Sequence, residues 1–201
     1  AQAAVAIEIL MFAPMRLSNL QSLRLDEHIS WQAERMRINI PSQQVKNAQA
    51  LDFLLPASVS KRIKTYIDKW RMHFTSGHNP HLFPGRNGKP KDGTCLRRQI
   101  EQTLWNEAGI RLTPHQFRHA AAKILLDAKP GHYEVVRKVL GHKSLSTTYS
   151  HYAGAETQAA ISLYDDVIIQ HRQRKAFDRG PDNRAPEPPF MDPLQLYGGK
   201  R

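Results

Sequence analysis

The stretch TPHQFRHAAAKILLDAKPGHYEVVRKVLGHKSLSTTYSHYAG, residues 113–154, decides the fold and most of the chemistry of this chain. Its opening Thr113-Pro114 predicts a helix over about 115–128, because proline is favoured in the first turn of a helix. Residues three apart lie on the same face of a helix, so His115 and Arg118 can point at one ligand.

The second half of the stretch predicts another helix, over about 131–140, which ends at Gly141. His142 follows directly, and Tyr152 comes ten residues after it. Arginine binds phosphate oxygens in a planar fork, histidine exchanges protons near neutral pH, and tyrosine can form a covalent intermediate. Taken alone, a His-x-x-Arg pair is typical of exposed helix residues, a Gly-His pair of a helix cap, and a helical tyrosine of packing. Their joint occurrence favours chemistry on a phosphate.

In this order and spacing the motifs resemble those of the tyrosine recombinases, the phage integrase family. Their catalytic domains carry H-x-x-R, then L-G-H, then a tyrosine, which here read HQFR, LGH and Tyr152. Upstream, APMRLSNLQSL is similar to the family's first arginine box, commonly T-G-x-R-x-S-E-L, and this aligns Arg16 with the first catalytic arginine. PSQQVKNAQALDFLLP resembles the β-hairpin that carries the catalytic lysine, here Lys46. The resemblance covers about residues 1–160.

The resemblance implies that Arg16 and Arg118 bind the scissile phosphate and stabilise the charge of the transition state, and that His115 and His142 hydrogen-bond the phosphate. It also requires Arg16 to lie near Arg118 in space. Two arginines then do what metal ions do in many nucleases, so no metal is expected. The phosphodiester energy would be kept in the bond to the tyrosine, so neither ATP nor another cofactor is expected. His73, His78 and His81 lie in a Gly/Pro-rich loop without paired acids, so no metal site is expected there either.

The proton transfers implied by the resemblance fall to other residues. His115 would move the proton of the tyrosine, Lys46 would protonate the leaving 5′ oxygen, and Tyr152 would become joined to the 3′ phosphate. The implied function is a site-specific recombinase or integrase of a mobile element. It would act on double-stranded DNA as a homo-oligomer, a tetramer in this family.

Two departures from the family pattern leave alternatives open. Many members place the tyrosine nine residues after the LGH histidine, where this chain has His151, so Tyr152 is the favoured nucleophile and Tyr149 the alternative. Asn19 stands where the family usually has an acid, three residues after the arginine. A DNA-binding regulator or remnant that keeps the fold but does not cleave is therefore the alternative function, and a type IB-like topoisomerase a more distant one.

Composition agrees with a nucleic-acid partner. The net charge is +11, and residues 61–100 hold ten Lys/Arg against two Asp. This balance favours a polyanion, either nucleic acid or an anionic membrane surface. A single cysteine, Cys95, excludes a disulfide within the chain and a Cys-rich zinc module, and favours a reducing compartment. No apolar run approaches the ~20 residues of a membrane span, and the expected location is cytoplasmic, at the bacterial nucleoid.

The remaining pattern predicts a mainly α fold with a small antiparallel sheet or hairpin. Helices are expected over 1–13, 16–25, 57–73, 94–108, 145–152 and 154–177, short strands within 28–55, and a loop over 74–93. In the helix over 57–73 the expected apolar side consists of Val59, Ile63, Tyr66, Ile67 and Trp70.

The expected domain organisation is a catalytic domain over residues 1–177, followed by a flexible Pro-rich tail over 178–201. Within the domain, the helix over 154–177 is a candidate for docking onto a neighbouring protomer. No segment resembles the family's N-terminal DNA-clamping domain, so the chain is expected to be the catalytic domain alone.

Overall fold

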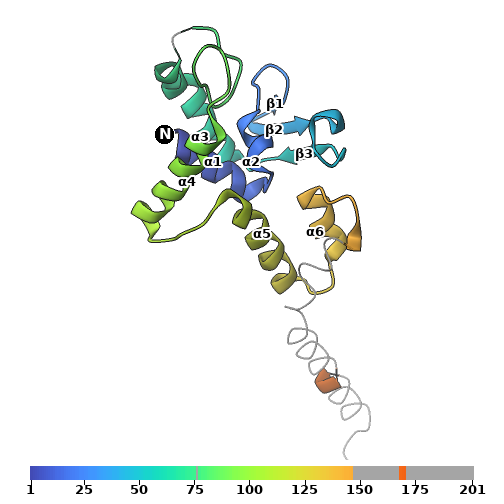
Figure 1. Ribbon diagram of the computed structural model, residues 1–201. Helices are drawn as coiled ribbons and strands as arrows, with labels where there is room; N and C mark the ends of the chain where they lie inside the picture. The colour runs from blue at the N-terminus through green and yellow to red at the C-terminus, as the bar shows by residue number, and fades with distance from the viewer. Residues whose placement is uncertain (76, 147–167, 171–201) are drawn as a thin grey trace, which may run out of the picture. The chain divides into compact units, whose positions relative to one another are not determined.

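The computed structural model describes residues 1–75, 77–146 and 168–170. Figure 1 shows a mainly helical protein with one small sheet, which confirms the predicted fold class. In chain order the elements are α1 (Gln2–Phe12), α2 (Leu17–Gln21), β1 (Ile29–Gln32), β2 (Arg35–Ile40), η1 (Ser42–Gln44), β3 (Leu51–Leu54), α3 (Ala57–Thr65), η2 (Tyr66–Trp70), η3 (Arg71–Phe74), α4 (Gly93–Ala108), α5 (Pro114–Ala128) and α6 (Tyr133–Leu140). Within these ranges no helix is long and apolar enough to cross a membrane.

The sheet has three antiparallel strands in the order β1-β2-β3. In the central strand Ile38 pairs with Ile29 on one side and with Phe53 on the other. Met36, Ile38 and Ile40 are buried while the residues between them are not, as expected for a strand with one face on a core. The long connection between β2 and β3 carries Lys46, so the predicted hairpin is present.

Two hydrophobic clusters hold these elements together. The main core packs α1, the sheet and α3 with α4, and includes Phe117 from the first turn of α5. A smaller cluster joins α5 to α6 through Ala122, Leu126, Val136 and Leu140. Helix α5 therefore bridges both clusters, and the residues between Phe117 and Ala122 lie where the two clusters meet.

The predicted helix over 57–73 is present but not uniform. It runs as α3 to Thr65, widens into the π-turn η2, and tightens into the 3₁₀ turn η3. Val59, Ile63 and Tyr66 are buried as expected, whereas Trp70 is 54 % exposed, so its predicted place on the apolar side was wrong. A π-turn holds more residues per turn than an α-helix, and this rotates Trp70 away from the core.

The other predicted helices agree with the structure to different extents. The helix predicted over 1–13 is α1, but the one predicted over 16–25 ends at Gln21 as α2, and Arg24 pairs instead with His81 in an isolated β-bridge. The helices predicted at about 94–108, 115–128 and 131–140 are α4, α5 and α6. Residues 168–170 are helical and belong to a separate unit, residues 160–201. Otherwise the predicted helix over 154–177 and the tail over 178–201 lie outside the described residues, as does the helix over 145–152 beyond residue 146.

Candidate active site

The first turn of α5 is fixed by its own sequence. The Thr113 side chain accepts a hydrogen bond from the Gln116 backbone N–H, and the Gln116 side chain accepts one from the Thr113 N–H. This reciprocal pair, followed by proline at the first helical position, defines where the helix begins. It therefore also sets the direction in which the side chains of His115 and Arg118 project from the helix.

Arg118 is the residue that joins the predicted motifs. It is 3 % exposed, at the point where α5 passes between the two hydrophobic clusters. Its Nη1 donates to the carbonyl of Pro14 at 2.6 Å, and its Nη2 donates to the carbonyl of Leu140 at 2.7 Å. Pro14 lies two residues before Arg16, and Leu140 two residues before His142. One guanidinium thus brings the first arginine box and the LGH motif against the HxxR helix.

Arg16 occupies the start of α2, with its backbone still extended at φ −69° and ψ 150°. Its carbonyl accepts the first helical hydrogen bond, from the Leu20 N–H at 3.0 Å, and its side chain is half-buried. Asn19 in the same short helix is 4 % exposed. Among the described atoms, its Nδ2 has no hydrogen-bond partner, so the residue that replaces the usual acid carries an unsatisfied amide.

The backbone at the LGH motif is held in a left-handed turn. Gly141 has φ +59°, and a Cβ built on it would come within 2.7 Å of Leu51 Cδ2 in β3. The His142 N–H donates to the Arg137 carbonyl at 2.9 Å, and Arg137 Nη1 returns a bond to the His142 carbonyl at 3.1 Å. Only glycine satisfies both the backbone angle and the approach to the sheet.

Arg137 is itself oriented by Glu134, one turn earlier on α6. Their side chains pair at 2.6 and 2.7 Å, and this pairing lowers the pKa of the Glu134 carboxyl. Both residues were missed by the sequence analysis. Their spacing of three on one helix just before Gly141 is the signal that points to them.

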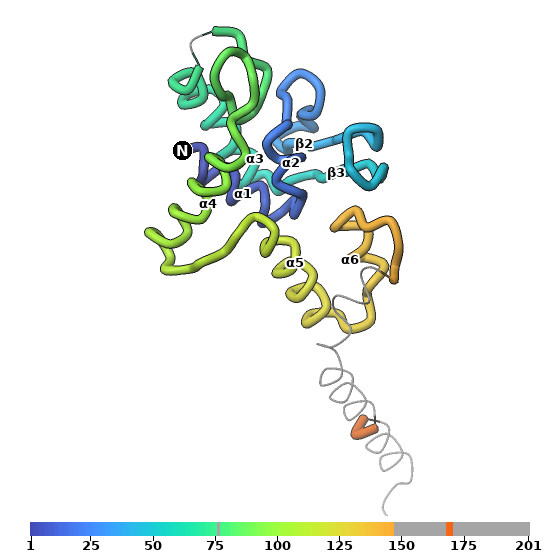
Figure 2. Tube along the Cα trace, in the orientation of Figure 1, coloured from blue at the N-terminus to red at the C-terminus, as the bar shows by residue number. Residues whose placement is uncertain are grey.

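Lys46 lies exposed in the loop between β2 and β3. The residues beside it are anchored: Val45 is buried in the main core, and Asn47 Nδ2 donates to the Gly141 carbonyl at 2.7 Å. Figure 2 shows this loop and the end of α6 near one another. The hairpin is therefore tied to the residue before His142, through an asparagine that the sequence analysis did not single out.

His115 is exposed on the first turn of α5, one turn before Arg118. Its Nε2 lies 3.1 Å from Nε2 of His119, and the two rings meet edge to face with centroids 4.8 Å apart. One of these nitrogens must carry the proton and the other must accept it. His119 was also missed, although a spacing of four residues on a helix predicts this neighbour.

The candidate nucleophiles Tyr152 and Tyr149 both lie outside the described residues. Among the other predicted residues, the structure joins the segments of Arg16, Lys46 and His142 through Arg118 and Asn47. No group of three His, Cys, Asp or Glu suited to a metal ion occurs in the described ranges.

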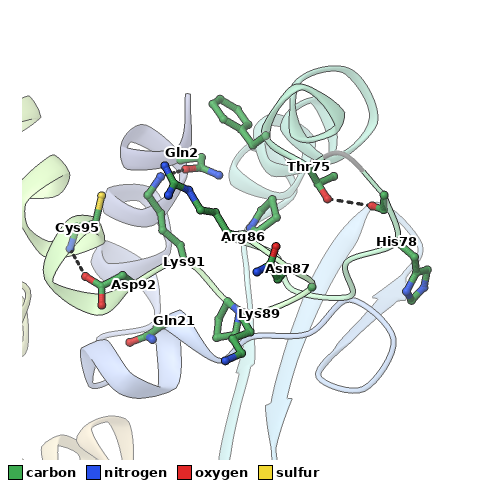
Figure 3. A pocket seen from close by; sticks show the side chains of 16 residues that line it. Gln2, Gln21, Thr75, His78, Arg86, Asn87, Lys89, Lys91, Asp92 and Cys95 are labelled. Carbon is green, nitrogen blue, oxygen red and sulfur yellow. Dashed lines mark hydrogen bonds between the residues drawn. The ribbon is translucent and has the colours of Figure 1, made fainter.

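A separate hollow of about 1020 Å³ lies beside the loop that precedes α4, and none of the candidate catalytic residues lines it. Arg86, Lys89 and Lys91 contribute to its wall, and Lys91 donates to the side chain of Gln2 (Figure 3). Other cations of the basic stretch are used within the protein, for example Arg62 by Glu8. Arg86 and Lys89 are exposed, so part of the positive charge of the basic stretch lies on the surface at this hollow.

Comparison with known proteins gives one consistent answer. The model of the phage integrase family matches residues 1–159. Over 116 residues the chain is 34 % identical to the tyrosine recombinase XerC of Brucella suis, covering 56 % of this chain and 34 % of the relative. Over 167 residues it is 30 % identical to a tyrosine recombinase of Thermosipho africanus, covering 78 % of this chain and 52 % of the relative.

Solved structures share the fold. The XerH site-specific recombinase bound to palindromic difH substrate in a post-cleavage complex superposes with a TM-score of 0.63 at 23 % identity, over 81 % of this chain and 46 % of that one. The Tn1549 transposon integrase in complex with transposon right end DNA gives 0.58 at 19 % identity, over 82 % and 58 %. The chain spans about a third to a half of the length of the curated relatives it matches.

Proposed function

The chain belongs to the phage integrase family, and on that premise we propose that it cleaves and rejoins DNA at specific sites through a covalent 3′-phosphotyrosine. The observation that carries the proposal is the position of Arg118. This buried arginine bonds the Pro14 and Leu140 carbonyls, and so ties to α5 the two segments that carry the proposed phosphate-binding residues Arg16 and His142. Arginine and histidine side chains carried on segments held together in this way are suited to binding a phosphate while its bonds are exchanged.

In the proposed reaction Arg16 and Arg118 bind the non-bridging oxygens of the scissile phosphate, and His142 donates a further hydrogen bond. Charge builds on these oxygens as the phosphorus becomes five-coordinate, so donors held in place beforehand lower the barrier. The two hydrogen bonds between His142 and Arg137, one from the His142 N–H and one from the Arg137 side chain, support this because they fix the backbone of the residue that carries one of the donors.

Tyr152 is the proposed nucleophile. Its hydroxyl oxygen bonds to phosphorus, its proton passes to His115, and the bond from phosphorus to the 5′ oxygen breaks. Lys46 gives a proton to the departing 5′ oxygen, so no charged alkoxide is released. Rejoining runs the same steps in reverse from a new 5′ hydroxyl. The phosphodiester bond energy is kept in the phosphotyrosine, so the proposed reaction needs neither ATP nor a metal ion.

The proposed partner is double-stranded DNA, bound by a homo-tetramer, with residues 1–177 as the catalytic domain. The basic hollow by α4 supports this partner, because Arg86 and Lys89 can each neutralise a phosphate of the DNA backbone.

A trapping assay tests the proposal. The full chain is incubated with DNA from the ends of its genetic element, nicked beside the scissile phosphate so that the short fragment leaves after cleavage. We expect a covalent protein–DNA adduct that forms in EDTA and without ATP. Tyr152→Phe should abolish the adduct while Tyr149→Phe retains it. The opposite pattern would transfer the nucleophile to Tyr149, and an adduct that survives the double substitution would refute the mechanism.

A further inference from the structure

A buried histidine outside the predicted site is connected to the loop that carries Lys46. His28 is 3 % exposed and ends the turn that follows α2. Its Nδ1 accepts a hydrogen bond from the Arg24 backbone N–H at 3.0 Å. Its Nε2 lies 2.6 Å from Oε1 of Gln44, the last residue of η1. Both nitrogens of the ring are therefore engaged by groups from different parts of the chain.

These bonds determine where the proton of His28 lies. A backbone N–H can only donate, so Nδ1 must be the unprotonated acceptor. The proton of the neutral ring is then on Nε2, from which it is donated to the Gln44 carbonyl oxygen. The amide nitrogen of Gln44 donates in turn to Glu27, and Glu27 also pairs with Arg24 Nε at 3.2 Å. The amide of Gln44 is thus held at both its oxygen and its nitrogen.

Gln44 lies two residues before Lys46. Val45, between Gln44 and Lys46, is buried. On the other side of Lys46, Asn47 donates to the Gly141 carbonyl. The exposed lysine is therefore flanked by one anchor on the turn after α2 and another on the LGH turn. Losing either anchor removes the side-chain hydrogen bond that holds the loop on that side of Lys46.

We propose that His28 is a positioning residue, which acts through Gln44 to hold Lys46 where it can protonate the leaving 5′ oxygen. The inference rests on the proposed function, because it concerns the position of Lys46 in that reaction. It predicts that loss of the His28–Gln44 bond slows the proton transfer to the leaving group and leaves DNA affinity unchanged.

The experiment uses two substrates in the trapping assay. One has the natural 5′ oxygen at the scissile bond, and the other has sulfur in its place. A thiolate is stable enough to leave without a proton, so the sulfur substrate does not need Lys46. Lys46→Ala serves as the reference, slow on the oxygen substrate and restored to the wild-type rate on the sulfur substrate.

Gln44→Ala is the main variant, because the residue is exposed and is not part of the hydrophobic core. The lost hydrogen bond should slow cleavage of the oxygen substrate by about 3- to 10-fold. Cleavage of the sulfur substrate should proceed at the wild-type rate. Gln43→Ala, an exposed neighbour in the same turn, is the matched control and should behave as wild type on both substrates.

His28→Asn completes the test. The asparagine oxygen can replace Nδ1 as the acceptor from Arg24, while nothing replaces the donor to Gln44. The double variant with Gln44→Ala should be no slower than the slower single variant, since both changes break one connection. Fully additive losses would overturn the inference.

The remaining outcomes separate two kinds of failure. If Gln44→Ala slows both substrates equally, or neither, while wild type and Lys46→Ala behave as expected, the inference alone is overturned. If the wild-type chain forms no adduct with either substrate, or Lys46→Ala is not restored by sulfur, the failure lies in the proposed function and the inference falls with it.

Discussion

Replacing Gly141 with alanine is expected to displace the turn that precedes His142. Gly141 has φ +59°, and the new Cβ would meet Leu51 Cδ2 at 2.7 Å. Gly109 provides a matched control, because it ends α4 with φ +66° but has open space where a Cβ would stand. Both substitutions impose the same backbone strain, and only the first also forces a contact with the sheet.

The expected magnitudes follow from the shared backbone strain and from the one additional contact. A left-handed backbone costs a residue with a Cβ roughly 1–2 kcal/mol, and this applies to both variants. Forcing an extra methyl group into a packed site adds about 1–3 kcal/mol. Gly141→Ala should therefore lower the free energy of unfolding by roughly 2–5 kcal/mol, and Gly109→Ala by roughly 1–2 kcal/mol.

Urea unfolding followed by circular dichroism measures this difference directly. The midpoint for Gly141→Ala should lie below that for Gly109→Ala by on the order of 1 M urea, for the usual slopes of small proteins. In the trapping assay Gly141→Ala should form adduct more slowly even when fully folded, and Gly109→Ala should not. Equal midpoints for the two variants would refute the argument that β3 restricts the LGH turn.

Three further predictions concern the hairpin anchor, the basic hollow and the core. Asn47→Ala removes the bond to the Gly141 carbonyl, and should slow adduct formation about 3- to 10-fold with unchanged DNA affinity; a loss of affinity instead would argue against a role in aiming Lys46. Replacing Arg86 and Lys89 together with alanine should reduce the slope of log affinity against log salt by about 2, measured by fluorescence anisotropy, and an unchanged slope would place the DNA elsewhere. Burial raises the pKa of Tyr66 from 10.0 to about 12, so its contribution to stability is full below pH 10 and is lost as the pH rises towards 12. This loss should reach ~2–3 kcal/mol in urea titrations, and Tyr66→Phe, the control, should lack this part of the pH dependence.

Much of the architecture could be predicted because its signals are local. The caps of α5 and the glycine that ends α6 are contained in a few adjacent residues, and the structure shows both helices where the sequence predicted them. The exposed side chain of Trp70 was mispredicted because a regular helical period was extended through the π-turn. Nothing in the local pattern indicates that widening.

The candidate site divides in the same way. Motif spacing led to His115, Arg118 and His142, and the family resemblance added Arg16 and Lys46 as candidates for the same reaction. The hydrogen bonds that hold these segments together were not evident from the sequence. Asn47 is an ordinary turn residue until the fold brings Gly141 to it, and His28 is an ordinary histidine until Gln44 reaches its ring.

The sequence by itself thus determined the helices, the hairpin, the basic charge and the resemblance on which the chemistry is proposed. Only the tertiary structure decided that Arg118 bonds a carbonyl 104 residues away and that Asn47 bonds one 94 residues away. Helix periodicity and capping act over a few residues, and a linear pattern therefore encodes them. Contacts between distant carbonyls and side chains depend on how the two hydrophobic clusters pack, and this is fixed only when the whole chain has folded.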